Sequence, residues 1–251
     1  MRTVAVIQAR NGSTRFPRKV LATLQGRPML AHIVERVSRA TLVDSVVVAT
    51  TDGRGDDEVA TLAAFLGAGV TRGSEDDVLS RYVLAAREHD ADVIVRITAD
   101  CPLTDPEIVD AVLRARAEHN ADYASNEEPA TFPEGYDCEV FSAACLARVD
   151  REATLPYERE HVTVHIREHL DEFVTAHVAN DPDLSWMRLT VDVPADLDRI
   201  AHLLSVLPES PPPGLAAVVS AFDADPGLHD QSGLPLRNER YHAQREAAHR
   251  A

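Results

Sequence analysis

Several residue types and patterns are scarce in this sequence, and each scarcity excludes a class of protein. Cysteine occurs only three times, an odd number without paired metal-ligand spacing, at Cys101, Cys138 and Cys145. We therefore expect neither a disulfide framework nor a cysteine metal site, and a reducing cytoplasm is the simplest compartment. No segment approaches the roughly 20 apolar residues of a membrane-spanning helix. The apolar run at residues 4–7 ends too soon for a signal peptide, so we expect no membrane partner.

Basic residues are also in the minority. The 251 residues include 41 acidic and 25 basic side chains, which gives a formal net charge of −16. A nucleic-acid surface needs concentrated Lys and Arg against the phosphate backbone, so we expect no nucleic-acid partner. Any cluster of cations in this acidic background therefore needs an explanation of its own.

Buried strands and amphipathic helices alternate along the first half of the chain. Apolar runs predict strands at residues 4–7, 45–50, 67–70 and 92–98. Helical spacing of apolar residues follows each of them, at residues 30–37, 57–66, 77–89 and 106–119. This order predicts parallel βαβ units, in which ligands bind beyond the carboxyl ends of the strands. The loops after Ile7, Val48 and Ile97 should therefore converge on one site.

The second half of the chain is less regular. We expect a loop and strand at 132–141, a helix at 158–170, a strand at 188–193 and a helix at 215–222. Residues 1–222 are interpreted as one domain. Residues 223–251 are polar and charge-rich, which is typical of a poorly ordered tail or of an arm that needs a partner.

The loop that follows the first predicted strand, at residues 8–19, carries four cations in ten positions: Arg10, Arg15, Arg18 and Lys19. Gly12 permits close backbone approach, and the backbone amides there could form an anion nest. Arginine binds phosphate through two parallel hydrogen bonds, so a triphosphate is the expected anion. The alternative is a solvated basic turn. The loop has neither the Walker A nor the G-x-G-x-x-G spacing, which disfavours kinase-type and dinucleotide sites.

This loop, Gln8-Ala9-Arg10-x-Gly12-Ser13-Thr14-Arg15-x-Pro17-x-Lys19, resembles the signature loop of the cytidylyltransferases. That family includes the synthetases of CMP-Kdo and CMP-sialic acid, and the resemblance is greatest to the SpsF-like branch of spore-coat polysaccharide biosynthesis. Five further ordered blocks extend it, at residues 73–82, 96–103, 133–141, 158–163 and 189–192. The resemblance implies a three-layer α/β/α fold of the nucleotide-diphospho-sugar transferase type. Its sheet would be mostly parallel, with a small β-rich subregion for dimerisation and the acceptor.

The resemblance also implies roles for single residues. The nucleotide and its phosphates would be bound by Gln8, Ala9, Arg10, Gly12, Ser13, Arg15, Lys19, Ser74, Asp77 and Arg81. Arg10, Lys19 and Asp100 would be catalytic, and Asp100 and Asp192 would hold Mg²⁺, which prefers oxygen ligands and shares its shell with phosphates. For either aspartate taken alone, a helix N-cap is the first explanation, and the two together favour the metal. For Asp77 and Arg81, an i,i+4 ion pair is the alternative.

The acceptor side is expected on the block around 133–141 and on the following helix, at Glu134, Asp137, Glu139, Arg159 and His161. A solvated loop is the alternative for the three carboxylates. The spacing of His161, His165 and His169 places them on one face of a continuous helix. A zinc site there is disfavoured, because the sequence lacks the H-E-x-x-H pattern.

The implied reaction is in-line attack of an acceptor oxygen on the α-phosphorus of CTP, with release of pyrophosphate. The acceptor would be a sugar acid of the Kdo or nonulosonate kind, a sugar phosphate or a phosphonate, and the enzyme a homodimer. The loop Thr98-Ala99-Asp100-Cys101-Pro102 departs from the Gly-Asp-x-Pro of the best-known members, which leaves the acceptor open. Two rivals remain. One is a nucleotide-sugar-dependent glycosyltransferase, although the second Asp of an Asp-x-Asp pair is missing; the other is a non-catalytic nucleotide-binding protein.

Overall fold

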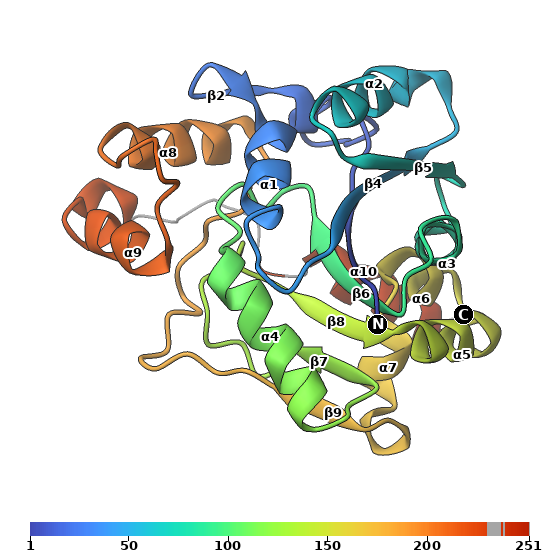
Figure 1. The fold of residues 1–251 in the computed structure, drawn as a ribbon. Coiled ribbons are helices and arrows are strands. Elements are labelled where there is room, and N and C mark those ends of the chain that lie inside the picture. The colour runs from blue at the N-terminus through green and yellow to red at the C-terminus, as the bar shows by residue number, and fades with distance from the viewer. Residues whose placement is uncertain (230–236, 238, 251) are drawn as a thin grey trace.

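The computed structural model describes residues 1–229, 237 and 239–250, and its centre is a seven-stranded sheet (Figure 1). The strand order is β5-β4-β1-β6-β8-β7-β9. Four strands form a parallel half: β1 (Thr3–Gln8), β4 (Ser45–Thr51), β5 (Gly69–Gly73) and β6 (Val93–Thr98). Their side chains are buried by helices on both faces of the sheet, and this is why they appear in the sequence as continuous apolar runs.

The other half of the sheet mixes directions. β8 (Glu139–Ser142) is antiparallel to both β6 and β7 (Tyr123–Ser125), and β9 (Thr175–His177) is parallel to β7. A separate two-stranded hairpin joins β2 (Thr23–Leu24) to β3 (Arg27–Pro28). The predicted mostly parallel sheet with flanking helices is confirmed.

Helices cover both faces, so the molecule has three layers. One face packs against α1 (Met29–Val37), α2 (Asp57–Phe65) and α4 (Pro106–Glu118). The other packs against α3 (Val78–Glu88), α5 (Ala143–Glu152), α6 (Pro156–His161) and α7 (Val164–Glu168). A third apolar cluster joins α8 (Pro194–Ser205) and α9 (Leu215–Asp223) to the edge of α1. Short 3-10 turns lie at Lys19–Leu21, Arg54–Asp56, Leu170–Glu172 and Pro226–Leu228.

Two expected elements are wrong. Residues 188–193 form no strand: they run beside loops, where Leu189 N donates to Glu134 O and Val191 N donates to Asp100 O, at 2.8 and 2.9 Å. The predicted helix at 158–170 is broken between α6 and α7, because Val162 has φ 60° and ψ −57°. Its three histidines therefore do not share one helix face.

Part of the segment expected to be a polar tail is helical. Helix α10 (Glu239–Arg250) lies behind α6 in Figure 1, and it buries Tyr241 against Tyr157 and Val164. The apolar pattern of residues 239–250 does not predict this helix, because Tyr241 is their only large apolar side chain.

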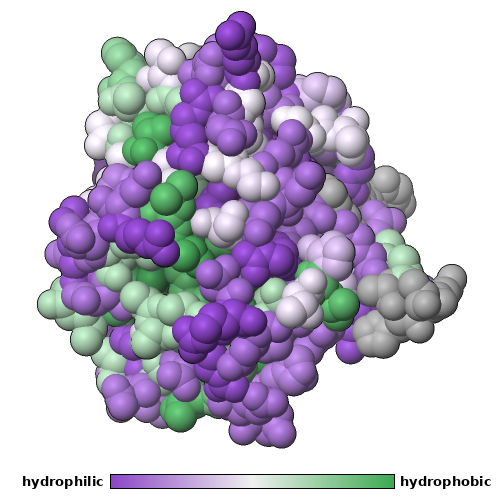
Figure 2. All heavy atoms as spheres, turned by 90° about the vertical axis from the view of Figure 1, so that its right-hand side faces the viewer, coloured by the Kyte–Doolittle hydropathy of each residue, from purple (hydrophilic) through white to green (hydrophobic). Residues whose placement is uncertain are grey.

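The face shown in Figure 2 is mostly hydrophilic and is interrupted by small, separate groups of apolar side chains. Every helix among the described residues is too short or too polar to span a membrane.

Candidate active site

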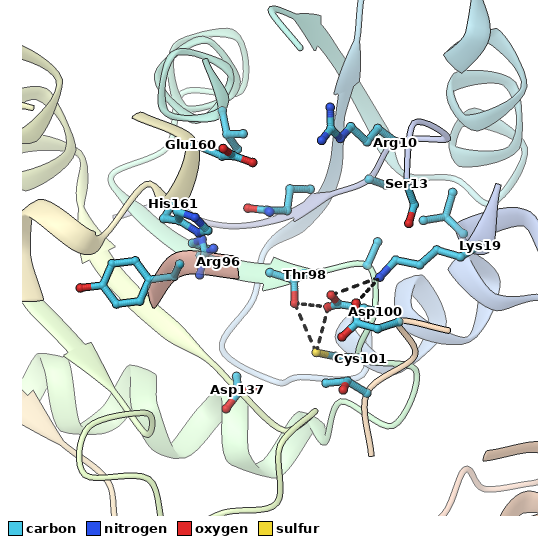
Figure 3. Close-up of a pocket in the computed structure, with 18 of the residues that line it drawn as sticks. Arg10, Ser13, Lys19, Arg96, Thr98, Asp100, Cys101, Asp137, Glu160 and His161 are labelled. Atoms are coloured by element: carbon cyan, nitrogen blue, oxygen red, sulfur yellow. Dashed lines mark hydrogen bonds and ion pairs between the residues drawn. The ribbon is translucent and has the colours of Figure 1, made fainter. Parts of the chain in front are cut away.

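A cavity of about 590 Å³ opens at the carboxyl ends of β1 and β6, where the strand order predicts a ligand site. The loop at residues 8–19 and the turn at 98–101 form one end of the cavity. Its lining is completed by the segment at 190–192 and by helices α6, α7 and α10 (Figure 3). Most of the sequence-predicted site residues line it: Gln8, Ala9, Arg10, Ser13, Arg15, Lys19, Arg81, Asp100, Glu134, Asp137, His161 and Asp192. The loops after Ile7 and Ile97 therefore converge as expected, but the loop after Val48 does not line the cavity and instead contacts the basic loop through Asp56.

The basic loop presents three of its four cations to the cavity. Arg10 pairs with Glu75 at 2.7 Å, and Arg15 lies 3.4 Å from Asp192. Arg18 faces away and pairs with Glu58 on α2. Asp56 anchors the loop by accepting a 2.6 Å hydrogen bond from the backbone N–H of Asn11.

Lys19 lies between the two carboxylates that were expected to hold a metal. Its Nζ is 3.0 Å from Asp192 Oδ1 and 3.4 Å from Asp100 Oδ2, and it also donates to Val191 O at 2.8 Å. Burial alone would lower the pKa of Lys19, but the attraction of Asp100 and Asp192 outweighs burial and raises it. For Asp100, burial raises the pKa, but the charge of Lys19 and the hydroxyl of Thr98 lower it by more. The net effect is a lowered pKa. Both groups are therefore charged at neutral pH.

The same pair of carboxylates fits a divalent cation. The Nζ atom of Lys19 lies within 3.4 Å of one oxygen of Asp100 and one oxygen of Asp192, so both carboxylates face the same point. Within the part of the chain that the structure describes, no group of three or more His, Cys, Asp or Glu side chains could hold a metal. Two carboxylates suit Mg²⁺ when phosphate oxygens and water supply the rest of its ligands.

Other residues from the nucleotide set support the loop from outside the cavity. A Cβ added to Gly12 would lie 3.0 Å from Glu75 Oε1, so the glycine permits this close approach. Ser74 accepts from the N–H of Asp77, and Asp77 caps α3 by accepting from Ser80 N at 2.9 Å. Gly12, Ser74 and Asp77 do not line the cavity.

The alternative i,i+4 pair between Asp77 and Arg81 is wrong. Asp77 pairs instead with Arg159, at 2.7 Å. Arg81 donates to the carbonyl oxygens of Ser74 and Glu75, so it stabilises the turn before α3 while it lines the cavity.

The end of the cavity away from the basic loop contains paired carboxylates. Glu134 pairs with Arg188 at 2.8 Å, and burial, only partly offset by Arg188, raises its pKa to about 7. Asp137 pairs with Arg237, and burial likewise raises the pKa of Asp137. A solvated loop is therefore a poor description of these two residues.

Glu139, expected beside the acceptor, is buried and does not line the cavity. It pairs with Arg96 and accepts a 2.7 Å hydrogen bond from Tyr123 Oη. Arg96 does line the cavity, so Glu139 holds a cavity residue in place. The sequence offered a signal for Arg96, since it interrupts the apolar run of the strand at 93–97.

Arg167 and Glu127 also line the cavity and were missed from the sequence. They pair at 3.3 Å. Burial, with the nearby charges of Glu139 and Asp137, raises the pKa of Glu127 to about 8. Neither residue lies in a motif, and only the fold brings α7 beside the loop after β7.

His161 reaches the cavity because the chain turns sharply after it. Thr163 N donates to His161 O at 2.6 Å across Val162, which forms a γ-turn with positive φ. Such backbone is unfavourable for a β-branched residue and occurs where the surrounding structure imposes it. Arg159 points elsewhere, to Asp77 and Asp150, and does not line the cavity.

The chain is similar to known proteins over most of its length. A family model described as cytidylyltransferase matches residues 4–210. The chain belongs to the cytidylyltransferase family. It is therefore a nucleotidyltransferase, and the family expected from the basic loop is confirmed.

Two relatives and one solved structure illustrate the family. The spore coat polysaccharide biosynthesis protein SpsF of Bacillus subtilis is 32% identical over 229 residues, which cover 88% of this chain and 94% of SpsF. The 3-deoxy-manno-octulosonate cytidylyltransferase of Geotalea daltonii is 41% identical over 122 residues, 48% of this chain and 47% of that protein. A cytidylyltransferase structure from Leptospira borgpetersenii has a TM-score of 0.89 at 31% identity and covers 94% of this chain and 100% of that one.

Proposed function

We propose that this cytidylyltransferase transfers CMP from CTP to an oxygen of a small acidic, sugar-like acceptor and releases pyrophosphate. One observation carries the proposal. The cations of the basic loop and the carboxylates Asp100 and Asp192 line one end of a single cavity, whose other end is lined by Arg96, Arg167 and His161. Such a cavity can hold a triphosphate and a second substrate in contact with each other. Enzymes catalyse phosphoryl transfer largely by this positioning of the two substrates.

At the nucleotide end, Arg10, Arg15 and Lys19 would bind the triphosphate. Each of these side chains is paired with a carboxylate, which fixes the position of its positive charge in the cavity. Phosphate oxygens would exchange for some of these partners. As the bond between the α-phosphorus and the bridging oxygen breaks, charge accumulates on the departing pyrophosphate, where fixed cations stabilise it.

Asp100 and Asp192 would hold Mg²⁺, which would neutralise charge on the triphosphate. Thr98 fixes Asp100 for this purpose, because its hydroxyl donates to Asp100 Oδ1 at 2.5 Å. Arg188 fixes Asp192 by donating to its other oxygen, Oδ2, at 2.7 Å.

At the acceptor end, two buried arginines favour an anionic group on the acceptor. Arg96 and Arg167 both line the cavity, and each keeps a buried Nε–H without a hydrogen-bond partner among the described residues. A carboxylate, phosphate or phosphonate would satisfy them. Glu134, Asp137 and His161 could accept hydrogen bonds from hydroxyl groups. The names of SpsF and of the octulosonate enzyme support a sugar-like acceptor.

Pyrophosphate release from each of the four ribonucleoside triphosphates with Mg²⁺ tests the proposal. The acceptor panel is a 2-keto-3-deoxy sugar acid, a nonulosonic acid, a sugar phosphate and a phosphonate. Release that needs both CTP and one acceptor is the expected result. Binding of CTP without release from any combination would favour the non-catalytic alternative, and transfer from a nucleotide-sugar would favour a glycosyltransferase.

A further inference from the structure

Helix α10 lies beyond the residues that the family model matches, yet it reaches the active-site cavity. The family model ends at residue 210, whereas Glu239 and Tyr241 of α10 line the cavity together with Arg10 and Asp100. In Figure 3, the faint red ribbon of the C-terminal end passes beside His161. A segment beyond the matched family model thus forms part of the site.

Tyr241 anchors this helix. Only 8% of it is exposed, because its ring packs against Tyr157 and lies 5.6 Å, centre to centre, from the ring of His161. Its hydroxyl donates to Glu168 at 3.0 Å, and the guanidinium of Arg167 lies 5.3 Å from its ring centre. Tyr241 therefore contacts two side chains, His161 and Arg167, that line the acceptor end.

Gln244 makes the second attachment. Its side-chain oxygen lies 2.6 Å from His161 Nε2, and its side-chain nitrogen donates to Glu160 at 2.7 Å. Both His161 and Glu160 line the cavity, so one amide fixes the orientation of two cavity residues. Burial lowers the pKa of His161, which favours the neutral ring at neutral pH. Arg245 pairs with Glu168 on the far side, at 2.7 Å.

A further contact joins α10 to the basic loop. Glu239 lies 3.4 Å from Arg15, and both side chains are more than 40% exposed, so this pair is weakly stabilising. The buried side chain of α10, Tyr241, packs against residues of α6 and α7. Helix α10 therefore closes the cavity mainly on the acceptor side.

We propose that α10 is the acceptor-side wall of the active site, and that Tyr241 and Gln244 are its specificity-determining residues. The inference rests on the proposed function and deepens it. Tyr241 and His161 line the cavity, and Gln244 holds His161 and Glu160 in place behind it. An aromatic ring beside a neutral imidazole matches the faces and hydroxyl groups of a sugar ring. These groups offer nothing to a short, hydroxyl-free phosphonate, so the wall favours the sugar acids among the proposed acceptors.

Tyr241→Ala tests the wall in the full-length enzyme, with two comparison variants. Tyr241→Phe keeps the ring and loses the hydrogen bond to Glu168. Ala243→Ser changes an exposed position on the same helix and serves as the control. Two quantities are measured: the KM for the acceptor identified by the panel, and the Kd of Mg–CTP by calorimetry.

We expect Tyr241→Ala to raise the acceptor KM by about tenfold or more while CTP affinity stays within about twofold. The Phe variant should show a smaller rise, and Ala243→Ser none. An equal loss of CTP and acceptor binding would overturn the proposal, because α10 would then only support the fold. So would an acceptor KM that is the same in all four proteins, or a hydroxyl-free phosphonate as the preferred acceptor.

A second measurement does not need the acceptor. Hydrogen exchange of the backbone amides of 241–247 should be at least about tenfold slower in the wild-type enzyme than in Tyr241→Ala. Equal exchange would mean that Tyr241 does not anchor α10 and would overturn the proposal that this helix lines the site. If no acceptor is turned over while this protection is present, the proposed function fails and the wall stands as a structural element of the site.

Discussion

The ammonium group of Lys19 lies 3.0 Å from the carboxylate of Asp192, although 173 positions separate the two residues. Lys19 belongs to the basic loop after β1, and Asp192 to an extended segment outside the sheet. Asp100, after β6, reaches the same Nζ at 3.4 Å. Three distant segments therefore bring two carboxylates and a cation to one point, at the end of the cavity that the basic loop lines.

Two arginines of the basic loop should differ in their effect on CTP binding. Arg10→Ala removes a cation that lines the cavity, and we expect CTP affinity to fall roughly ten- to a hundredfold, the worth of a charged hydrogen bond. Arg18→Ala removes an equal charge that faces Glu58, so it should change the Kd little. Calorimetric titration with Mg–CTP measures both. Equal losses would show that the loop acts only through its net charge.

Two aspartates near the start of α4 should separate catalysis from stability. Asp100→Ala should lower kcat about a hundredfold or more, because charge stabilisation at the triphosphate is lost. Asp105→Ala should leave kcat nearly unchanged and cost about 1 kcal/mol or more of unfolding free energy. Asp105 caps α4 through Glu107 N and also accepts from Leu215 N, at 2.9 and 2.7 Å. Steady-state rates and urea unfolding of both variants decide, and normal turnover by Asp100→Ala would remove the metal assignment.

The stability of the protein should depend on pH through Glu127. Burial and the nearby Glu139 and Asp137 raise its folded-state pKa to about 8, against an ordinary value of 4.5, while Arg167 opposes the shift. A carboxyl with a raised folded-state pKa stabilises the fold only while protonated, so its contribution is lost as the pH rises from about 4.5 to about 8.

Melting temperatures from pH 4 to pH 9 test this dependence. Glu127→Gln should match the wild type at pH 4 and become more stable than it by pH 9. The neighbouring Glu128→Gln serves as the control, because this side chain is 53% exposed. Parallel curves for wild type and Glu127→Gln would contradict the assignment.

The pair of Arg96 and Glu139 should behave as one buried unit. Glu139→Gln leaves the Arg96 charge without its main partner and should cost about 3–5 kcal/mol of unfolding free energy. The double variant Arg96→Met/Glu139→Gln should recover much of that loss, since it removes both charges. Chemical unfolding of these two variants and of Arg96→Met measures the coupling. A stable Glu139→Gln with a raised acceptor KM would instead place Glu139 against the acceptor.

The βαβ half of the fold was predictable because its signals are local. Val4 to Ile7 and Val93 to Val95 are apolar runs buried on both faces, and each is followed by helical spacing. Once these strands are parallel, the sheet geometry alone brings the loops at 8–19 and 98–101 together. The basic loop and Asp100 could therefore be assigned to one site from the sequence.

The rest depends on contacts that no local pattern encodes. Leu189 and Val191 alternate with polar residues as in a strand, but they pack in the third apolar cluster while their backbone pairs with loops. Val162 interrupts a sequence of good helical periodicity, because the fold turns His161 toward the cavity. Helix α10 has one buried anchor, Tyr241, and its position depends on side chains some 80 residues earlier.

The bond that breaks in CTP tests the central claim most directly. The wild-type enzyme is incubated with Mg²⁺, CTP and the acceptor panel, and the products are separated and identified by mass. The account predicts pyrophosphate and a CMP conjugate of one acceptor in equal amounts, with neither product formed when the acceptor is left out. Inorganic phosphate and CDP as the products, or unchanged CTP with every acceptor, would contradict it.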